Sequence, residues 1–178
     1  MNFEILKQKI ETAAKKAFLD AYEKHGSEKI YSFALYSDEG AMTVCPATNT
    51  VRVLEHYAEE GDLVYYKYEP AEWAYEMEGA EKEFDDICSE LRAELDKNDE
   101  DNGWFEKFQT GLYSACVEVL EKLKKENFFS QITGDEIFLI FTVSDYEFET
   151  DDLRKIITRL NDNEYKNEYL AWMDTWGN

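Results

Sequence analysis

The segment at residues 137–143, with the sequence IFLIFTV, constrains the fold more than any other part of the chain. Side chains of a β-strand alternate between the two faces of a sheet. Apolar side chains occupy odd and even positions alike in this segment, so neither face offers a polar side to water. A strand of this kind needs cover on both faces. We therefore expect residues 137–143 to be a central strand of a sheet covered by helices.

Elsewhere the apolar residues recur mostly at helical spacing, with capping residues before them and glycines after several of them. Gly26, for example, ends the first such pattern. The spacing predicts seven helices, at residues 3–22, 51–58, 70–77, 84–95, 105–123, 150–160 and 165–176. Asn49 or Thr50 is the expected N-cap of the second helix, Gly61 its expected end, and Pro70 fits the first turn of the third.

Strand patterns are fewer. Residues 31–35 and 42–46 flank the turn SDEG and predict a β-hairpin whose second strand ends at Pro46. The aromatic run LVYYKY at residues 63–68 predicts a third strand. The fold class expected for residues 1–178 is α+β: one domain with a small, three- to four-stranded, mainly antiparallel sheet covered by about seven helices.

The negative charge is unevenly distributed. Residues 1–54 carry seven acidic and seven basic side chains, whereas residues 55–106 carry 19 acidic and four basic ones, out of a net charge of −21 for the chain. An acidic surface repels nucleic acid and anionic membranes and attracts basic partners. The composition thus predicts a basic protein as partner, with no nucleic acid and no membrane; the alternative is that the charge serves solubility alone.

The three cysteines, Cys45, Cys88 and Cys116, are widely spaced and form no paired motif, so we expect buried free thiols. The amphipathic, charged N-terminal segment does not resemble a signal peptide, and no apolar run reaches the length of a membrane span. A cytoplasmic location is therefore expected. The pattern leaves the oligomeric state open.

Residues that carry chemistry are scarce. His25 and His56 have no partner at metal-ligand spacing, and the eight glycines stand singly, without a phosphate-binding loop. Residues 98–109 can be aligned with a calcium loop, but Gln109 stands where a bidentate Glu is required, so a polar turn is the better interpretation. We expect no catalytic residue, no metal and no cofactor.

One aromatic and acidic block, within residues 65–78, has more Tyr and Trp than a strand needs. Rings with a polar tip suit interfaces and pockets, and a partner's Lys or Arg can lie against them. The alternative is ordinary core packing. The candidate partner-binding residues are Tyr66, Tyr68, Glu69, Glu72, Trp73, Glu76 and Glu78.

Two segments, FALYSDEGAMTVCPATNT at residues 33–50 and YKYEPAEWAYE at residues 66–76, resemble the bacterial family catalogued as domain of unknown function 4303. The resemblance implies no activity and no catalytic residue. Small acidic bacterial proteins of this kind are similar in size and genomic company to immunity proteins of toxin systems.

These observations predict a cytoplasmic protein-binding module, such as an immunity protein that neutralises a basic toxin or nuclease. The alternative is a small-ligand-binding protein or enzyme with a pocket near residues 65–75. A concave pocket with convergent polar groups would favour the ligand class, and a flat acidic surface would favour the protein-binding class.

Overall fold

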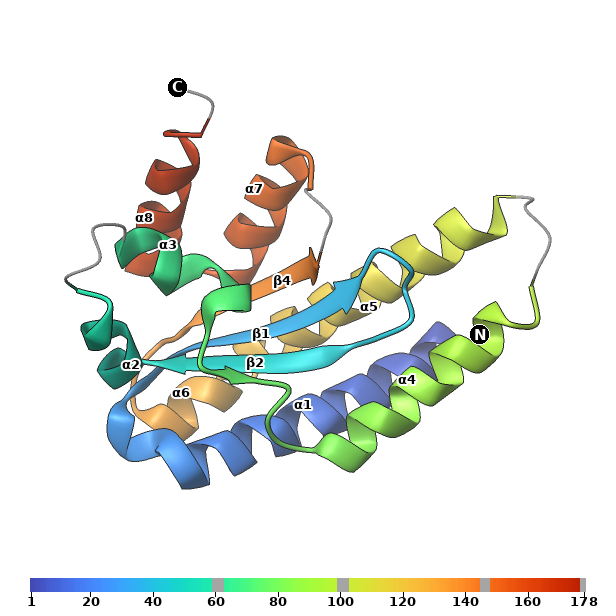
Figure 1. Ribbon diagram of the computed structural model, residues 1–178, viewed down its shortest axis with the longest axis horizontal. Coiled ribbons are helices and arrows are strands. Elements are labelled where there is room, and N and C mark those ends of the chain that lie inside the picture. Colours follow the sequence, from blue (N-terminus) through green and yellow to red (C-terminus); the bar gives the residue numbers. More distant parts are fainter. Residues whose placement is uncertain (59–62, 99–102, 145–147, 177–178) are drawn as a thin grey trace.

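The structure is a computed structural model that describes residues 1–58, 63–98, 103–144 and 148–176. A four-stranded sheet lies between two layers of helices (Figure 1). The strands are β1 (Ile30–Asp38), β2 (Cys45–Thr50), β3 (Tyr75–Glu76) and β4 (Phe138–Ser144). The helices are α1 (Phe3–His25), α2 (Val51–His56), α3 (Leu63–Tyr68), α4 (Glu81–Leu95), α5 (Trp104–Lys125), α6 (Phe128–Thr133), α7 (Thr150–Leu160) and α8 (Glu164–Met173), with short 3₁₀ turns at Gly26–Glu28 and Pro70–Glu72.

The α+β class is confirmed, but the sheet is mixed and not mainly antiparallel. Its strand order is β3-β2-β1-β4. β2 pairs antiparallel with both β1 and β3, whereas β4 runs parallel to β1. The helices α4, α5 and α6 separate the first three strands from β4 in the sequence. A connection of that length lets the chain cross the sheet and re-enter it in the same direction as β1.

Each face of the sheet contributes to its own core. Phe33 and Leu35 of β1 belong to the larger core, together with buried residues of α1, α4 and α5. Ala34 of β1 and Ile140 of β4 belong to a second core on the other face, with residues of α3, α7 and α8. This alternation along β1 is the ordinary consequence of strand geometry.

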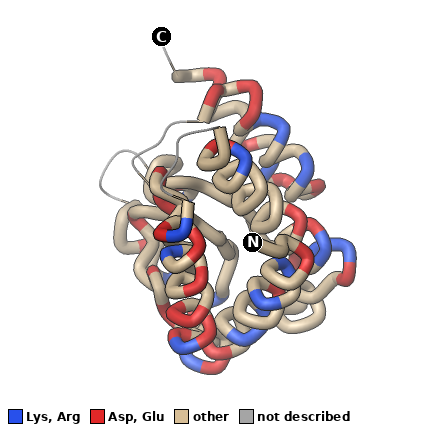
Figure 2. The backbone as a smooth tube through the Cα atoms, turned by 90° about the vertical axis from the view of Figure 1, so that its right-hand side faces the viewer, with Lys and Arg blue, Asp and Glu red and all other residues tan. Residues whose placement is uncertain are grey.

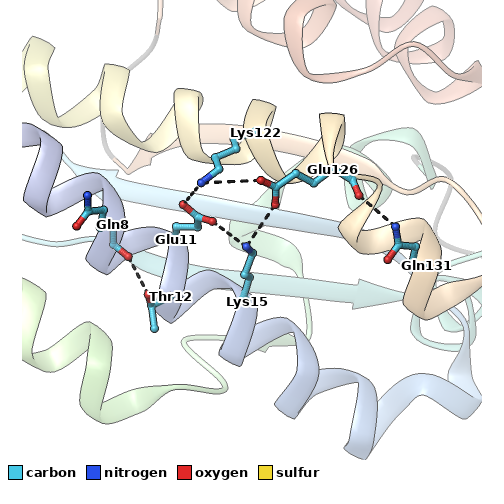
Figure 3. A network of polar contacts seen from close by, with 7 residues as sticks. All are labelled: Gln8, Glu11, Thr12, Lys15, Lys122, Glu126 and Gln131. Carbon is cyan, nitrogen blue, oxygen red and sulfur yellow. Dashed lines mark hydrogen bonds and ion pairs between the residues drawn. The ribbon is translucent and has the colours of Figure 1, made fainter.

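Charged side chains connect α1 and α5 outside the larger core (Figure 3). A carboxylate oxygen of Glu11 lies 2.7 Å from Lys15 Nζ, and the other lies 2.6 Å from Lys122 Nζ. Glu126 approaches the same two lysines at 3.3 and 3.8 Å. The two cations lower the pKa of Glu11 through their hydrogen bonds. Exposed pairs of this kind add little stability individually, but they fix how the two helices are aligned.

The strand β4 is an edge strand of the described sheet, so the expectation that it is central was wrong. It is nevertheless buried on both faces, as its apolar pattern required. The backbone edge that faces away from β1 is closed by a side chain: the Asn161 amide accepts a hydrogen bond from Leu139 N–H and donates one to Leu139 C=O, at 2.9 and 2.8 Å. Asn163 donates to the carbonyl of Ile137 at 3.2 Å. An asparagine amide thus takes the place of a further strand at this edge.

The expected strand at residues 63–68 was also wrong, because this segment is the helix α3. Val64 and Tyr68 are four residues apart, a spacing that places both on one helix face. There they reach the second core, where the Tyr68 ring lies 4.8 Å from that of Phe138. Burial of this face overrides the strand preference of Val and Tyr.

Two further boundaries differ from expectation around β3. Pro46 does not end β2 but lies inside it, opposite Leu35. Its carbonyl accepts the N–H of Met77, just past the end of the two-residue β3, so the missing proline N–H costs no ladder hydrogen bond. Pro70 does begin a short 3₁₀ turn, but the expected helix through Trp73 to Met77 is replaced by β3.

Several local predictions are confirmed. The helices expected at 3–22, 84–95, 105–123, 150–160 and 165–176 are present as α1, α4, α5, α7 and α8. Thr50 is the N-cap of α2 and accepts a hydrogen bond from Val53 N–H at 3.3 Å. The short helix α6 was not expected. The expected helix end at Gly61 lies outside the described residues, as do Glu100 and Asn102 of the calcium-like segment at 98–109.

Candidate functional site

The seven candidate partner-binding residues do not share one environment. Tyr68 and Trp73 are buried, with 1% and 4% of their surface exposed. The Tyr68 hydroxyl donates to Glu168 at 2.8 Å, and the Trp73 indole N–H donates to the carbonyl of Lys67 at 3.2 Å. Both residues therefore hold α3 and the following turn onto the sheet, and a substitution of Trp73 would report on folding before it reported on binding.

The remaining candidates are spread over two regions. Tyr66 stacks on Tyr57 of the turn after α2, with ring centres 4.3 Å apart. Glu76 is exposed. Glu78 points toward α1, where its carboxylate lies 2.8 Å from Lys24 Nζ and 3.2 Å from His25 Nε2. Of the seven candidates, Tyr68 and Glu69 line the cavity described next.

An open cavity of about 640 Å³ lies between α3, the turn at Pro70–Glu72, β4, α7 and α8. Figure 1 shows α3 beside α7 and α8 above this face of the sheet. Ile140 and Thr142 of β4 contribute to its lining. Six aromatic residues contribute to the wall: Tyr65, Tyr68, Phe148, Tyr169, Trp172 and Trp176. The volume falls within the range of ordinary ligand sites, ~300–1,000 Å³.

The aromatic rings are arranged edge to face more than stacked. The rings of Tyr68 and Tyr169 meet at 83° with centres 5.3 Å apart, and those of Trp172 and Trp176 meet at 87° and 4.9 Å. Tyr169 is buried, whereas 42% of the surface of Trp176 is exposed. The cavity therefore has a firmly packed inner wall and an accessible aromatic rim.

Glu69 supplies a carboxylate to this aromatic lining. Burial raises its pKa; the N–H of Ala71, which donates a hydrogen bond at 3.4 Å, acts in the opposite direction. Within the described ranges, no lysine or arginine lowers the pKa of Glu69 or forms an ion pair with it. A partly desolvated carboxylate without a counter-ion is an energetic cost that a bound cation would relieve.

Polar side chains near Glu69 have interactions of their own. The Tyr65 hydroxyl donates to Glu72 at 3.2 Å at the rim. Tyr169 lines the same cavity; burial raises its pKa most, and the charge of Glu69 raises it further. The cavity thus combines ring faces, a phenol and a carboxylate. This combination suits a cationic group with N–H donors.

Tyr169 and Trp172 of α8, and Trp176 just after it, were expected from the sequence only to form the apolar face of the last helix. Their spacing of three and four residues gave that signal. Nothing in the sequence connected them with Glu69.

The acidic stretch at residues 55–106 is partly neutralised by α1. Lys9 pairs with Glu90 at 2.5 Å and Lys16 with Glu83 at 2.7 Å, in addition to the pair of Lys24 with Glu78. Figure 2 shows Lys and Arg among Asp and Glu on the helices that face the viewer. The charge counted for residues 55–106 therefore overstates the negative electrostatic potential on the side of the molecule formed by α1 and α4.

Other chemistry is sparse in the part of the chain that the structure describes. There, no group of three or more His, Cys, Asp or Glu side chains could hold a metal ion. No helix among the same residues has both the length and the apolar character needed to cross a bilayer.

The two sequence segments that carry the family resemblance lie against each other. Ala47 and Thr48 of β2 pair with Glu76 and Tyr75 of β3. Asn49, also in β2, donates to the Tyr31 hydroxyl at 3.1 Å, and that hydroxyl donates to the same Lys67 carbonyl that accepts the Trp73 indole. The hydrogen bonds of Asn49, Tyr31 and Trp73 thus fix the position of α3 and of one side of the cavity.

The fold and site define a helix-covered α+β protein with an aromatic, carboxylate-bearing cavity. The chain belongs to the family described as a domain of unknown function, DUF4303, whose model matches residues 10–162. No curated protein and no solved structure matches the chain.

Proposed function

We propose that this protein is a protein-binding module that receives a cationic side chain of a basic partner in the cavity lined by Glu69 and the aromatic rings. The supporting observation is Glu69 itself, a partly buried carboxylate that is not paired with a cation in the described structure. A Lys or Arg side chain would supply the missing counter-charge and would lie against ring faces.

The magnitudes favour a cation over a neutral guest. A hydrogen bond to a charged group contributes about 1.5–3 kcal/mol. A cation over an aromatic face adds about 0.5–2 kcal/mol, more where water is excluded. A neutral side chain of the same shape can also donate a hydrogen bond to the carboxylate, so the cation–π term alone sets a lower bound on the preference for a cation, about 2- to 30-fold.

The partner we propose is a basic toxin or nuclease, which would make the chain an immunity protein. The net charge of −21 supports this choice, since it would accelerate encounter with a basic surface even after the ion pairs with α1 are taken into account. Within this proposal, long-range charge governs the association rate, and the cavity governs how long the complex lasts.

A small cationic ligand is a second candidate, which the cavity volume of about 640 Å³ favours. A free ligand would use the same rings and the same carboxylate. The two candidates differ in whether binding needs a protein partner, and the experiment below separates them.

The test compares Glu69→Gln with Glu76→Gln, an exposed carboxylate of the same acidic stretch that does not line the cavity. Immobilised wild-type protein captures its partner from the native host, and the bound protein is identified. Binding kinetics are then measured at two salt concentrations. We expect Glu69→Gln to raise the dissociation rate about tenfold or more, and Glu76→Gln to leave it unchanged.

A titration with N-acetylarginine amide and its uncharged citrulline analogue, followed by the fluorescence of Trp172 and Trp176, tests cation recognition directly. Tight binding of the arginine compound alone, without a protein partner, would favour the small-ligand candidate. Equal affinity for the two compounds, together with partner kinetics that Glu69→Gln does not change, would refute the cavity as the binding site.

A further inference from the structure

Two of the three cysteines lie at one cavity, although they are 43 positions apart in the sequence. Cys45 begins β2 and Cys88 lies on α4. The Cys88 sulfur lies 3.5 Å from both the nitrogen and the oxygen of Val44, the residue before Cys45. These contacts fix the Cys88 sulfur beside the start of β2.

Both sulfur-bearing residues line an open cavity of about 530 Å³, separate from the aromatic cavity. They keep 6% and 7% of their surface exposed, whereas Cys116 on α5 is entirely enclosed in the larger core. Arg92 and Asp85 of α4 line the same cavity. A reagent of a few atoms can therefore reach the pair of thiols but not Cys116.

The surroundings make the two thiols unequal. The hydrogen bond from Cys45 lowers the pKa of Cys88 most, and the Val44 N–H and the charge of Arg92 lower it further, against the opposing effects of burial and Asp85. The hydrogen bond with Cys88 raises the pKa of Cys45 most. Burial and the charge of Glu76 raise it further. Thiolate character makes a cysteine nucleophilic, so Cys88 is the more reactive member of the pair.

We propose that Cys45 and Cys88 form a peroxide-reactive dithiol that closes into a disulfide between β2 and α4. In the first step the Cys88 sulfur attacks one oxygen of hydrogen peroxide, the O–O bond breaks, and Cys88 sulfenic acid and water form. The Cys45 sulfur then attacks the sulfenic sulfur, and the S–O bond breaks to release a second water. The two sulfurs give two electrons to the peroxide, and a dithiol reductant restores the thiols.

The experiment treats the fully reduced wild-type protein with a small excess of hydrogen peroxide and then blocks the remaining thiols with N-ethylmaleimide. Peptide mapping under non-reducing conditions identifies what has formed. We expect a peptide in which Cys45 is linked to Cys88, with Cys116 blocked only after unfolding. Alkylation of Cys88 in the untreated protein should have its midpoint below that of an ordinary thiol, ~8.5.

Two variants separate the roles of the thiols. Cys45→Ala should stop the reaction at Cys88 sulfenic acid, which dimedone traps, whereas Cys116→Ala should form the disulfide as readily as the wild type. If a variant does not fold, the wild-type mapping alone decides. A linked peptide in the wild type supports the proposal. Recovery of both thiols unmodified, or oxidation of either without a Cys45–Cys88 link, overturns it.

Discussion

Asn161 closes the outer edge of β4, and its removal should destabilise the whole sheet. The residue follows α7 and is buried, with 1% of its surface exposed. Its side chain makes three hydrogen bonds: it accepts from Leu139 N–H at 2.9 Å and donates to the carbonyls of Leu139 and Ile157 at 2.8 and 3.2 Å. The substitution Asn161→Ala removes the side-chain partner of these three backbone groups. They lie in a buried part of the protein, where water cannot replace that partner.

The expected cost follows from which backbone groups are left unpaired. The carbonyl of Ile157 keeps a partner, because it also accepts the backbone N–H of Asn161 at 3.0 Å. The N–H and C=O of Leu139 lose their only partner on that edge. An unsatisfied buried group costs about 1–3 kcal/mol, so Asn161→Ala should lower the free energy of unfolding by about 2–6 kcal/mol.

Urea unfolding, followed by circular dichroism and tryptophan fluorescence, measures this loss. Asn163→Ala is the matched control, because it removes one hydrogen bond of 3.2 Å to Ile137, the residue just before β4, and should cost about 1 kcal/mol. Faster hydrogen exchange of the Leu139 amide in Asn161→Ala, and not in the control, would locate the effect. Equal losses in the two variants, or a loss below about 1 kcal/mol for Asn161→Ala, would refute the role of Asn161 as the edge closure.

A second variant checks the direction of the hydrogen bonds. Asn161→Asp keeps an acceptor for the Leu139 N–H but places a second oxygen against the Leu139 carbonyl. Burial should raise the pKa of this carboxyl in the folded state. Its destabilisation would then be greatest at neutral pH and would decrease as the pH falls through that raised pKa.

Two more outcomes are expected. Leu139→Ala should cost about 2–5 kcal/mol in urea unfolding, because this side chain is 2% exposed although β4 is an edge strand; a loss below about 1 kcal/mol would contradict the burial of β4 on both faces. Hydrogen bonds from Arg159 and then Lys125 lower the pKa of Glu121 to about 2. The ion pairs of Glu121 should therefore stabilise the protein at pH values above the usual pKa of a glutamate. This contribution, under about 1 kcal/mol for partly exposed groups, should be lost as the pH falls toward 2. Glu121→Gln should flatten this part of a stability-against-pH curve, and an unchanged curve would show that these ion pairs contribute nothing.

Local periodicity determined much of the fold. The apolar positions of α1 and α5 recur at helical spacing because one face of each helix is buried in the larger core. The strand β4 was evident because apolar side chains at every position require cover on both faces. The alternation on either side of a turn predicted a hairpin, and β1 does pair antiparallel with β2, but β2 runs over Cys45–Thr50 and not over residues 42–46. In each case, burial of one or both faces of a helix or strand produces a regular spacing of apolar residues along a continuous stretch of sequence.

Tertiary packing decided what local pattern could not. The segment at residues 63–68 has strand-forming residues, yet it is a helix because Tyr68 packs on Phe138, 70 positions away. The convergence of Glu69 and the α8 rings on one cavity, the position of the Cys88 sulfur beside the start of β2 and the ion pairs between α4 and the lysines of α1 all join distant parts of the chain. None of these arrangements leaves a periodic pattern in the sequence, because each depends on how complete helices and strands pack against one another. The sequence therefore determined the elements and their buried faces, whereas the tertiary structure alone brought the side chains of both cavities together.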